Sequence, residues 1–254
     1  MLRTRVIPTL LLKEVGLYKG IQFKNHQYVG DPINAVKIFN EKEVDELVFL
    51  DISATDNKRI NYELIADISA ETFMPFAYGG GISQVQQIEK LFHLGVEKVI
   101  INTAAFYYPE LITQASKLAG SQSIVVSIDV KKSLMGRYEV YVNNGKTRTK
   151  QAPIEYAKKI QDLGAGEVIV TSINREGTGS GYDLELLSQI SSAVEIPIVA
   201  SGGANSIDDF AQAVSKAHVS AVSAGSMFVF HGKHRAVLIT YPSYEKLEQA
   251  LQEN

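Results

Sequence analysis

The sequence has 254 residues, a formal net charge of −3 and no cysteine. Its length suits one large domain or two small ones, and its near-balanced charge, without a run of Lys and Arg, disfavours a nucleic-acid partner. The lack of cysteine excludes disulfides, thiolate metal sites and a cysteine nucleophile, and no stretch reaches the roughly 20 apolar residues of a membrane span, so we expect a cytoplasmic protein.

Short apolar runs alternate with longer segments of helical periodicity, a pattern typical of βαβ units. The expected strands lie near residues 5–12, 46–52, 75–79, 97–102, 123–129, 167–173, 196–201 and 218–224. The expected helices lie near residues 31–43, 59–71, 83–94, 109–118, 153–163, 183–193, 206–217 and 243–253. Eight strand–helix pairs in this length predict an α/β fold, a closed (β/α)8 TIM barrel that forms a single domain over 1–254. A doubly wound open sheet is the alternative.

The chain repeats itself at about half its length. The repeated segments are Glu46–Ile52 with Glu167–Ile173, and Tyr78–Ile82 with Ala200–Ala204. This duplication predicts two half-barrels, about 1–120 and 121–254, that close into one ring. The two halves differ at one position at the end of a strand, where Asp129 in the second half corresponds to Leu11 in the first.

Two long inserts interrupt the pattern at equivalent places in the two halves. Residues 13–30 follow the first strand and residues 131–150 follow the fifth, and Asn143-Asn144-Gly145 in the second insert predicts a hairpin turn. Both inserts come after the carboxyl end of a strand, where barrel loops build active sites. We therefore interpret them as candidate lids rather than as solvated excursions.

Glycine-rich strand ends form two clusters whose backbone N–H groups could approach an anion. The first cradle comprises Gly80, Gly81, Asn102 and Thr103. The second cradle comprises Gly177, Thr178, Gly202, Gly203, Gly225 and Ser226. Each glycine alone also fits a tight turn, but their pairing by the duplication predicts a ligand with phosphates at opposite ends.

Four charged residues begin strands: Arg5, Glu46, Lys98 and Glu167. Successive side chains of a strand alternate between its two faces, so all four can point into the barrel. They would then form a charged ring at the base, and buried charges persist only when they are paired. Ordinary solvated strand ends are the alternative.

The chain resembles the HisF family, the cyclase subunit of imidazole glycerol phosphate synthase, over essentially its whole length. The motifs that carry the resemblance are Asp45–Ile52, Gly79–Ile82, Ile101–Ala105, Gly120–Gln122, Thr171–Thr178, Ser180–Asp183 and Ala200–Gly203. The resemblance implies a barrel that binds a ribulosyl aminoimidazole carboxamide ribonucleotide through two phosphates. It also implies a separate, HisH-like glutaminase that docks on the N-terminal face and supplies ammonia. We expect no cofactor and no metal site.

The resemblance gives further residues a role. The charged ring matches the family's ammonia gate, Thr171 and Ser201 match positions along its ammonia channel, and Lys19 matches a lysine of its active-site loop. Amidotransferases of the familiar kind use a cysteine nucleophile. Any glutamine-derived ammonia must therefore come from a partner.

The family uses two carboxylates, at the ends of the first and fifth strands, as general acid and base. Asp129 matches the second, whereas Leu11 replaces the first. Proton transfer by a placed side chain contributes typically about 10²–10⁴-fold to a rate, so we expect the ordinary cyclase activity to be impaired. Glu14 lies close to Leu11 in the sequence, but it could replace the missing carboxylate only with a different site geometry. The sequence leaves two roles for Asp51, proton transfer and capping.

The lost carboxylate together with an intact gate resembles a divergent branch of the family in bacterial surface-sugar pathways, such as lipopolysaccharide O-antigen biosynthesis. That branch accompanies a glutaminase and a third, amidotransferase-like protein where an acetamido group becomes an acetamidino group. We therefore hypothesise a synthase subunit that delivers ammonia for amidine formation on a nucleotide-linked sugar. The alternatives are the authentic cyclase of histidine biosynthesis and a catalytically silent, phosphate-binding scaffold for the glutaminase.

Overall fold

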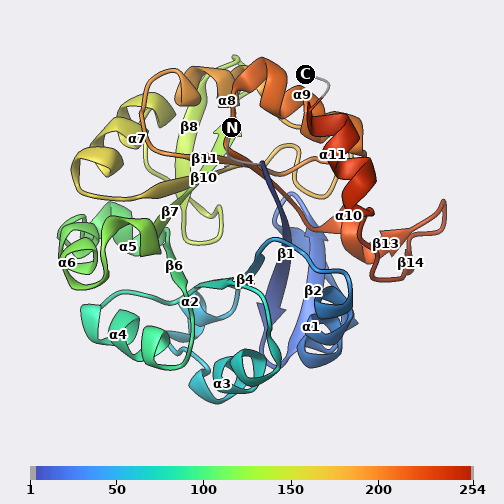
Figure 1. Cartoon of the computed structure of the whole chain (residues 1–254). Helices are drawn as coiled ribbons and strands as arrows, with labels where there is room; N and C mark the ends of the chain where they lie inside the picture. Colours follow the sequence, from blue (N-terminus) through green and yellow to red (C-terminus); the bar gives the residue numbers. More distant parts are fainter. Residues whose placement is uncertain (1–3, 253–254) are drawn as a thin grey trace.

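Eight parallel strands close into a ring in the computed structural model, which describes residues 4–252 (Figure 1). These strands are β1 (Arg5–Lys13), β4 (Leu47–Asp51), β5 (Phe76–Gly79), β6 (Lys98–Ile101), β7 (Ile124–Lys132), β10 (Glu167–Ser172), β11 (Ile198–Ser201) and β12 (Ala221–Ala224). Their order is β10-β11-β12-β1-β4-β5-β6-β7, and pairing of β7 with β10 completes the ring. The prediction of a (β/α)8 barrel is confirmed, and the open-sheet alternative is wrong.

Eight helices surround the ring. They are α1 (Pro32–Glu41), α3 (Tyr62–Glu71), α4 (Val85–His93), α6 (Glu110–Ala119), α7 (Pro153–Asp162), α8 (Leu184–Ser191), α9 (Ile207–Ala217) and α11 (Tyr244–Gln252). Local chemistry fixes their starts: Asp31 caps α1 by accepting a 2.9 Å hydrogen bond from the backbone N–H of Asn34, and Pro32 follows it. The last residue of the helix expected over 243–253 lies outside the described residues.

The described part of the chain also contains four short helical segments: α2 (Ala54–Asn57), α5 (Thr103–Tyr107), the 3-10 helix η1 (Ser121–Ser123) and α10 (Ser226–Val229). Three of them, α2, α5 and α10, follow barrel strands directly and were not predicted. Within residues 4–252, no helix combines the length and apolar character that crossing a bilayer requires.

The interior of the barrel contains an apolar layer to which each of the eight strands contributes one side chain. Its members are Ile7, Val48, Ala77, Ile100, Val125, Ile169, Val199 and Ala221. A second and larger apolar cluster fills the space between the strands and the surrounding helices. Side chains of a strand alternate between these two environments, as the two-residue period requires. We call the end where the strands begin the base, and the end where they finish the mouth.

Both long inserts fold as antiparallel hairpins at the mouth. The first consists of β2 (Gly16–Ile21) and β3 (Lys24–Gly30), and the second continues β7 into β8 (Tyr138–Val142) and β9 (Thr147–Arg148). The predicted Asn143–Gly145 turn joins β8 to β9, with φ of 54°, 54° and 71°. A further hairpin, β13 (Phe230–His231) with β14 (Ala236–Val237), was not predicted and projects from the barrel (Figure 1).

Candidate functional site

The strand register shows that Leu11 and Asp129 occupy corresponding positions in the two halves. Leu11 lies opposite Leu50 in the pairing of β1 with β4, and Asp129 lies opposite Thr171 in the pairing of β7 with β10. Leu50 and Thr171 are themselves the fifth residues of the repeated segments Glu46–Ile52 and Glu167–Ile173. The mismatch that the sequence indicated is therefore also a mismatch in three dimensions.

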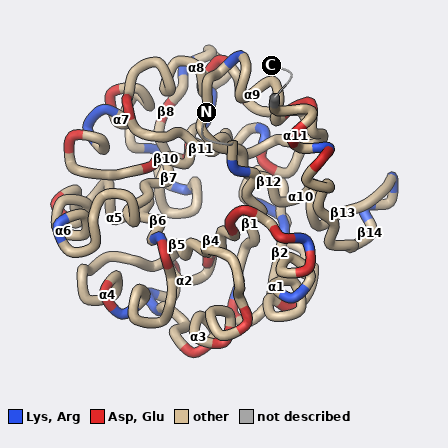
Figure 2. Tube along the Cα trace, viewed as in Figure 1, with Lys and Arg blue, Asp and Glu red and all other residues tan. Residues whose placement is uncertain are grey.

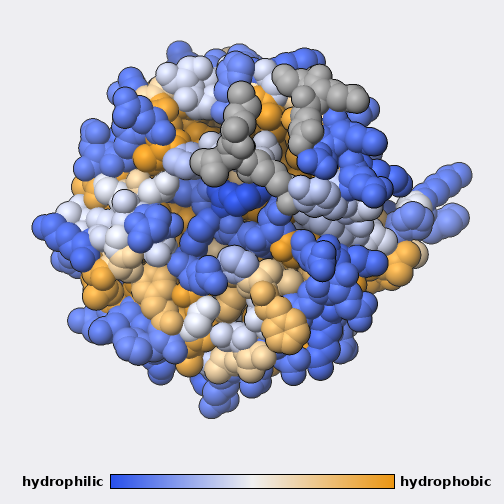
Figure 3. Space-filling model, in the orientation of Figure 1, coloured by the Kyte–Doolittle hydropathy of each residue, from blue (hydrophilic) through white to orange (hydrophobic). Residues whose placement is uncertain are grey.

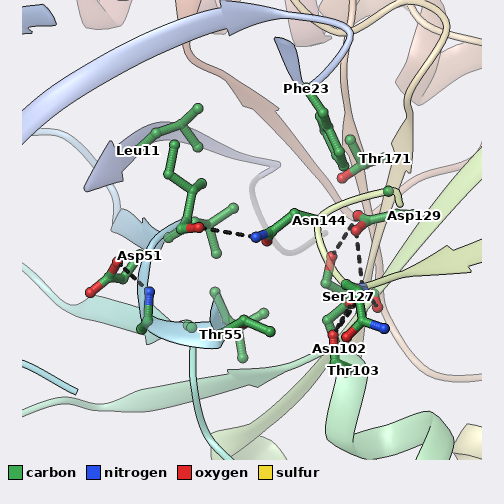
Figure 4. A pocket seen from close by; sticks show the side chains of 18 of the residues that line it. Leu11, Phe23, Asp51, Thr55, Asn102, Thr103, Ser127, Asp129, Asn144 and Thr171 are labelled. Atoms are coloured by element: carbon green, nitrogen blue, oxygen red, sulfur yellow. Dashed lines mark hydrogen bonds between the residues drawn. The ribbon is translucent and has the colours of Figure 1, made fainter. Parts of the chain in front are cut away.

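A cavity of about 1220 Å³ lies at the mouth, and both residues line it. Figure 4 shows Leu11 and Asp51 on one side and Asp129, Ser127 and Asn102 on the other. Nine of the ten cradle residues also line this cavity: Gly80, Gly81, Asn102, Thr103, Gly177, Gly202, Gly203, Gly225 and Ser226. Lys19, Thr171 and Ser201 line it as well.

Thr178 is the cradle residue that does not line the cavity. Its hydroxyl donates to the carbonyl oxygen of Arg175 at 2.7 Å and shares a hydrogen bond of 2.8 Å with the Ser180 hydroxyl. These contacts hold the loop after β10 together. The side chain of Thr178 is thus engaged within its own loop.

Some cradle glycines have a conformational reason to be glycine. Gly80 has a φ of 122°, and a Cβ there would lie 2.3 Å from the carbonyl oxygen of Asp51. Gly203 has a φ of 113°, and a Cβ there would lie 2.2 Å from the carbonyl oxygen of Gly181. The close backbone contacts alone require glycine at both positions. At Gly225 the nearest atom is instead the ammonium nitrogen of Lys19.

Asp129 is a buried carboxyl in a polar setting. Asn102 Nδ2 donates to its Oδ2 at 3.1 Å, and Ser127 Oγ donates to its Oδ1 at 3.3 Å. Burial raises the pKa of Asp129 to about 7, although the hydrogen bonds from Ser127 and Asn102 act in the opposite direction. A carboxyl that titrates near neutral pH can both donate and accept a proton, which suits a general acid or base.

Asp51 has a structural role. Its Oδ1 accepts hydrogen bonds from the backbone N–H of Ser53 at 2.9 Å, from the Ser53 hydroxyl at 2.7 Å and from the N–H of Ala54 at 2.9 Å. These bonds hold the turn between β4 and α2. The geometry favours the capping role that the sequence left open beside proton transfer.

Lys19, on β2, is almost completely buried, with 3% of its surface exposed. Its Nζ lies 3.4 Å from the carbonyl oxygen of Thr9 and 3.8 Å from Oε1 of Glu176. Burial lowers the pKa of Lys19, and Glu176 offsets part of that effect. The first insert therefore brings a buried cation to the second cradle.

Each insert reaches across the mouth to the opposite half of the barrel. In the first insert, the backbone N–H of Gln22 donates to the carbonyl oxygen of Glu176 at 2.8 Å, and its side-chain amide donates to Asn174 O at 2.7 Å. In the second insert, Asn144 Nδ2 donates to Ile52 O at 3.0 Å (Figure 4). The arrangement of the two inserts is thus reciprocal.

The tips of the two inserts also meet over the cavity. A Cβ on Gly145 would lie 2.9 Å from the ring of Phe23, and both residues line the cavity. Sequence reasoning did not single out Phe23, Ser127 or Asn144 as separate site residues. The duplication could have identified Ser127, because it lies two residues before Asp129 just as Thr9 lies two residues before Leu11.

At the base, the four charged side chains converge into a closed ring, as their positions at strand starts predicted. Lys98 Nζ lies 2.9 Å from Glu46 and 3.0 Å from Glu167, and Arg5 pairs with the same two carboxylates. Both glutamates are buried, whereas the two cations are partly exposed. Figure 3 shows hydrophilic residues over the centre of this face.

Comparison with known proteins gives consistent matches. A family model described as "Histidine biosynthesis protein" matches residues 5–235. A Pseudomonas aeruginosa protein, named provisionally as imidazole glycerol phosphate synthase subunit hisF2, is 52% identical over 98% of this chain and 99% of its own. The subunit HisF of Alkaliphilus metalliredigens is 40% identical over 91% of this chain and 92% of its own. The chain therefore belongs to the histidine biosynthesis protein family and is HisF-like within it.

Proposed function

We propose that this chain is a cytoplasmic, single-domain synthase subunit that receives ammonia from a separate glutaminase and delivers it for amidine formation on a nucleotide-linked surface sugar. The proposal rests on the strand register, which places Leu11 in the first half at the position that Asp129 holds in the second half. Leucine has no proton to give or accept. The cavity therefore has only one of the two carboxylates that the cyclase chemistry of the family uses.

The charged ring at the base and the interior of the barrel support the proposed ammonia route. The glutaminase docks at the base, where the charged ring of Arg5, Glu46, Lys98 and Glu167 surrounds the entrance. Ammonia then crosses the apolar layer as a neutral molecule and passes Thr171 and Ser201, which line the mouth cavity. An apolar layer favours neutral ammonia over ammonium, because burying an unpaired charge is costly.

A third, amidotransferase-like protein receives the ammonia at the mouth. Replacing a carbonyl oxygen by nitrogen requires an activated carbonyl, and that activation is the work of this third protein. Exposed apolar side chains on the hairpin turns of the mouth support a protein contact there: Val15 is 67% exposed and Met135 84%. Leu134, beside Met135, is fully exposed.

An activity comparison tests the proposal. The purified chain is given the ribulosyl bis-phosphate substrate and an ammonium salt, and imidazole glycerol phosphate is followed. We expect negligible turnover, with activation of the glutaminase when the chain is added to it. Turnover at the rate of an ordinary cyclase would overturn the proposal.

The second candidate is the authentic cyclase of histidine biosynthesis. It is favoured by the names of the relatives and by the two cradles that line a single cavity. Turnover in the same assay would establish it. A third reading, a catalytically silent scaffold, predicts glutaminase activation without ammonia reaching any acceptor.

A further inference from the structure

The tip of the second insert, the turn between β8 and β9, is attached to the first half of the barrel by two side chains. Asn144 Nδ2 donates to the carbonyl oxygen of Ile52 at 3.0 Å, and Lys146 pairs with Asp56 at 2.7 Å. Both tip residues line the cavity that Asp129 also lines. The tip therefore has a defined position relative to that carboxyl.

The residue before Asn144 makes a contact of a different kind. The backbone N–H of Asn143 donates to the hydroxyl oxygen of Thr103 at 3.0 Å. That hydroxyl lies 3.2 Å from Oδ1 of Asn102. A backbone N–H can only donate, and a hydroxyl has one hydrogen. Thr103 therefore accepts from Asn143 and gives its own hydrogen to Asn102.

The side-chain amide of Asn102 continues these hydrogen bonds to Asp129 (Figure 4). Its Oδ1 accepts from Thr103, whereas its Nδ2 donates to Ser127 O at 2.9 Å and to Asp129 Oδ2 at 3.1 Å. Both hydrogens of the amide nitrogen are thus used. One path of hydrogen bonds leads from Asn143 through Thr103 and Asn102 to Asp129.

The Thr103 hydroxyl is the link in this path that a substitution can remove most simply. Without it, the N–H of Asn143 and Oδ1 of Asn102 both lose the partner described above, and the oxygen end of the amide is no longer held. The amide nitrogen then holds Asp129 in a less defined direction, although the backbone of the strands is unchanged.

We propose that Thr103 is a positioning residue, which transmits the placement of the second insert to Asp129 through the amide of Asn102. The carboxyl is fully aligned only while the tip of the insert lies over the mouth. Such a link ties the readiness of the acid or base to the covering of the cavity. It acts in the same way whichever molecule accepts the ammonia, so it does not depend on the proposed function.

Titratable groups of several neighbouring elements surround Asp129. They are Lys19 of β2, Lys131 of β7, Tyr141 of β8, Tyr156 of α7 and Glu176 of the loop after β10. The charged residues of α6 and α7 are exposed on the outside of the ring (Figure 2). None of these groups belongs to the path, so the path can be changed while the charges around Asp129 stay the same.

Titration of Asp129 by ¹³C NMR tests the proposal. The full chain is labelled at its aspartate carboxyl carbons, and the signal that is missing from Asp129→Asn identifies Asp129. The hydrogen bond from Asn102 favours the ionised carboxylate, so Thr103→Val should raise the pKa of Asp129 from about 7 by roughly 0.5–1 pH unit. Thr103→Ser, which keeps the hydroxyl, should keep the pKa of the wild type.

Variants of the insert tip test the other end of the path. Asn144→Ala releases the tip from Ile52 and should raise the pKa of Asp129 by a smaller amount. Lys146→Gln, at the exposed ion pair of the same tip, is the control and should leave that pKa unchanged. In the double variant Thr103→Val/Asn144→Ala, the pKa should be no higher than in Thr103→Val alone, because the path is already broken.

An unchanged pKa of Asp129 in either Thr103→Val or Asn144→Ala would overturn the proposal. Equal changes in Thr103→Val and Thr103→Ser would also contradict it, because the hydroxyl would then not be the cause. Changes that add in the double variant would show that the tip acts on Asp129 by a route other than Thr103. The signals of the remaining aspartates show that each variant is folded.

Discussion

The two halves of the barrel present different chemistry to one cavity. At four corresponding places the first half has a side chain without a polar group, or none at all, and the second has a polar one. These pairs are Leu11 with Asp129, Leu50 with Thr171, Gly79 with Ser201 and Ile100 with Ser223. At these four places only the side chains of the second half can form hydrogen bonds or transfer a proton, although the backbone of each half is alike.

At the base, in contrast, the two halves share a glutamate at the start of corresponding strands, whereas both cations come from the first half and correspond to Ser123 and Ala221 in the second. Glu46 and Glu167 hold corresponding positions, and each pairs with both Arg5 and Lys98. A ring of four mutually paired charges tolerates little change, because loss of one partner leaves a buried charge uncompensated. The mouth carries no such constraint, so its four pairs have diverged, whereas the glutamates of the interlocked ring have persisted in both halves.

The largest expected effect follows from making the mouth symmetric. Leu11→Asp restores a carboxyl opposite Asp129 and should raise turnover of the ribulosyl substrate with ammonium by about 10²–10⁴-fold. Formation of imidazole glycerol phosphate measures it. Leu11→Asn is the control of matched size without a titratable proton. Equal rates for the two variants would show that the missing carboxyl is not what limits the reaction.

Removal of the carboxyl from the polar half should change the dependence of stability on pH. Because the pKa of Asp129 is raised to about 7, its ionisation opposes folding, and the wild type loses stability as the pH rises from about 4 to 7. Asp129→Asn should remove this loss. As the pH rises from 5 to 8.5, the free energy of unfolding of the variant should therefore increase by about 2–3 kcal/mol relative to that of the wild type. Urea unfolding at both pH values measures it.

The matched control is Asp56→Asn, at a carboxylate on the first half whose side chain is 54% exposed. It should give no comparable gain at high pH, since an exposed carboxylate keeps its hydration. A gain for Asp129→Asn that is the same at pH 5 and pH 8.5 would contradict the titration of a buried carboxyl.

The barrel itself could be predicted from the sequence because its order is periodic. Counting in twos from Arg5, Lys98 and Glu167 reaches Ile7, Ile100 and Ile169, and all three belong to the interior layer. The duplication then identified which residues of the two halves hold corresponding positions in these strands. Both signals are local or repeated, so no knowledge of long-range contacts was needed to place Leu11 against Asp129.

The cover over the mouth could not be predicted in the same way. Strand β3 is exposed along most of its length, so no alternation of apolar and polar residues marks it. The bond from Asn144 to Ile52 joins residues 92 apart in the chain, and that from Gln22 to Asn174 joins residues 152 apart. Contacts of this kind depend on the closed ring. The sequence pattern predicts the ring, but not which loop residues meet across its mouth.

The two glutamates of the base hold corresponding positions and pair with the same two cations, so changes to either should cause similar losses of stability. Glu46→Gln and Glu167→Gln each remove one charge from the ring and should each destabilise the fold by about 2 kcal/mol, less than for a fully buried pair because Arg5 and Lys98 reach solvent. Thermal and urea unfolding measure the two losses. A difference of more than about 1 kcal/mol between them would show that the base is not energetically symmetric.

The smallest effect concerns the attachment of the second insert to the first half. Lys146 pairs with Asp56 at 2.7 Å, but both side chains are more than half exposed, so Lys146→Gln should change stability by no more than about 0.5 kcal/mol. Asn144→Ala, which removes the bond to Ile52, should cost about 1 kcal/mol and speed proteolysis of the hairpin. Equal proteolysis of both variants would mean that the exposed ion pair, rather than the amide, holds the insert across the mouth.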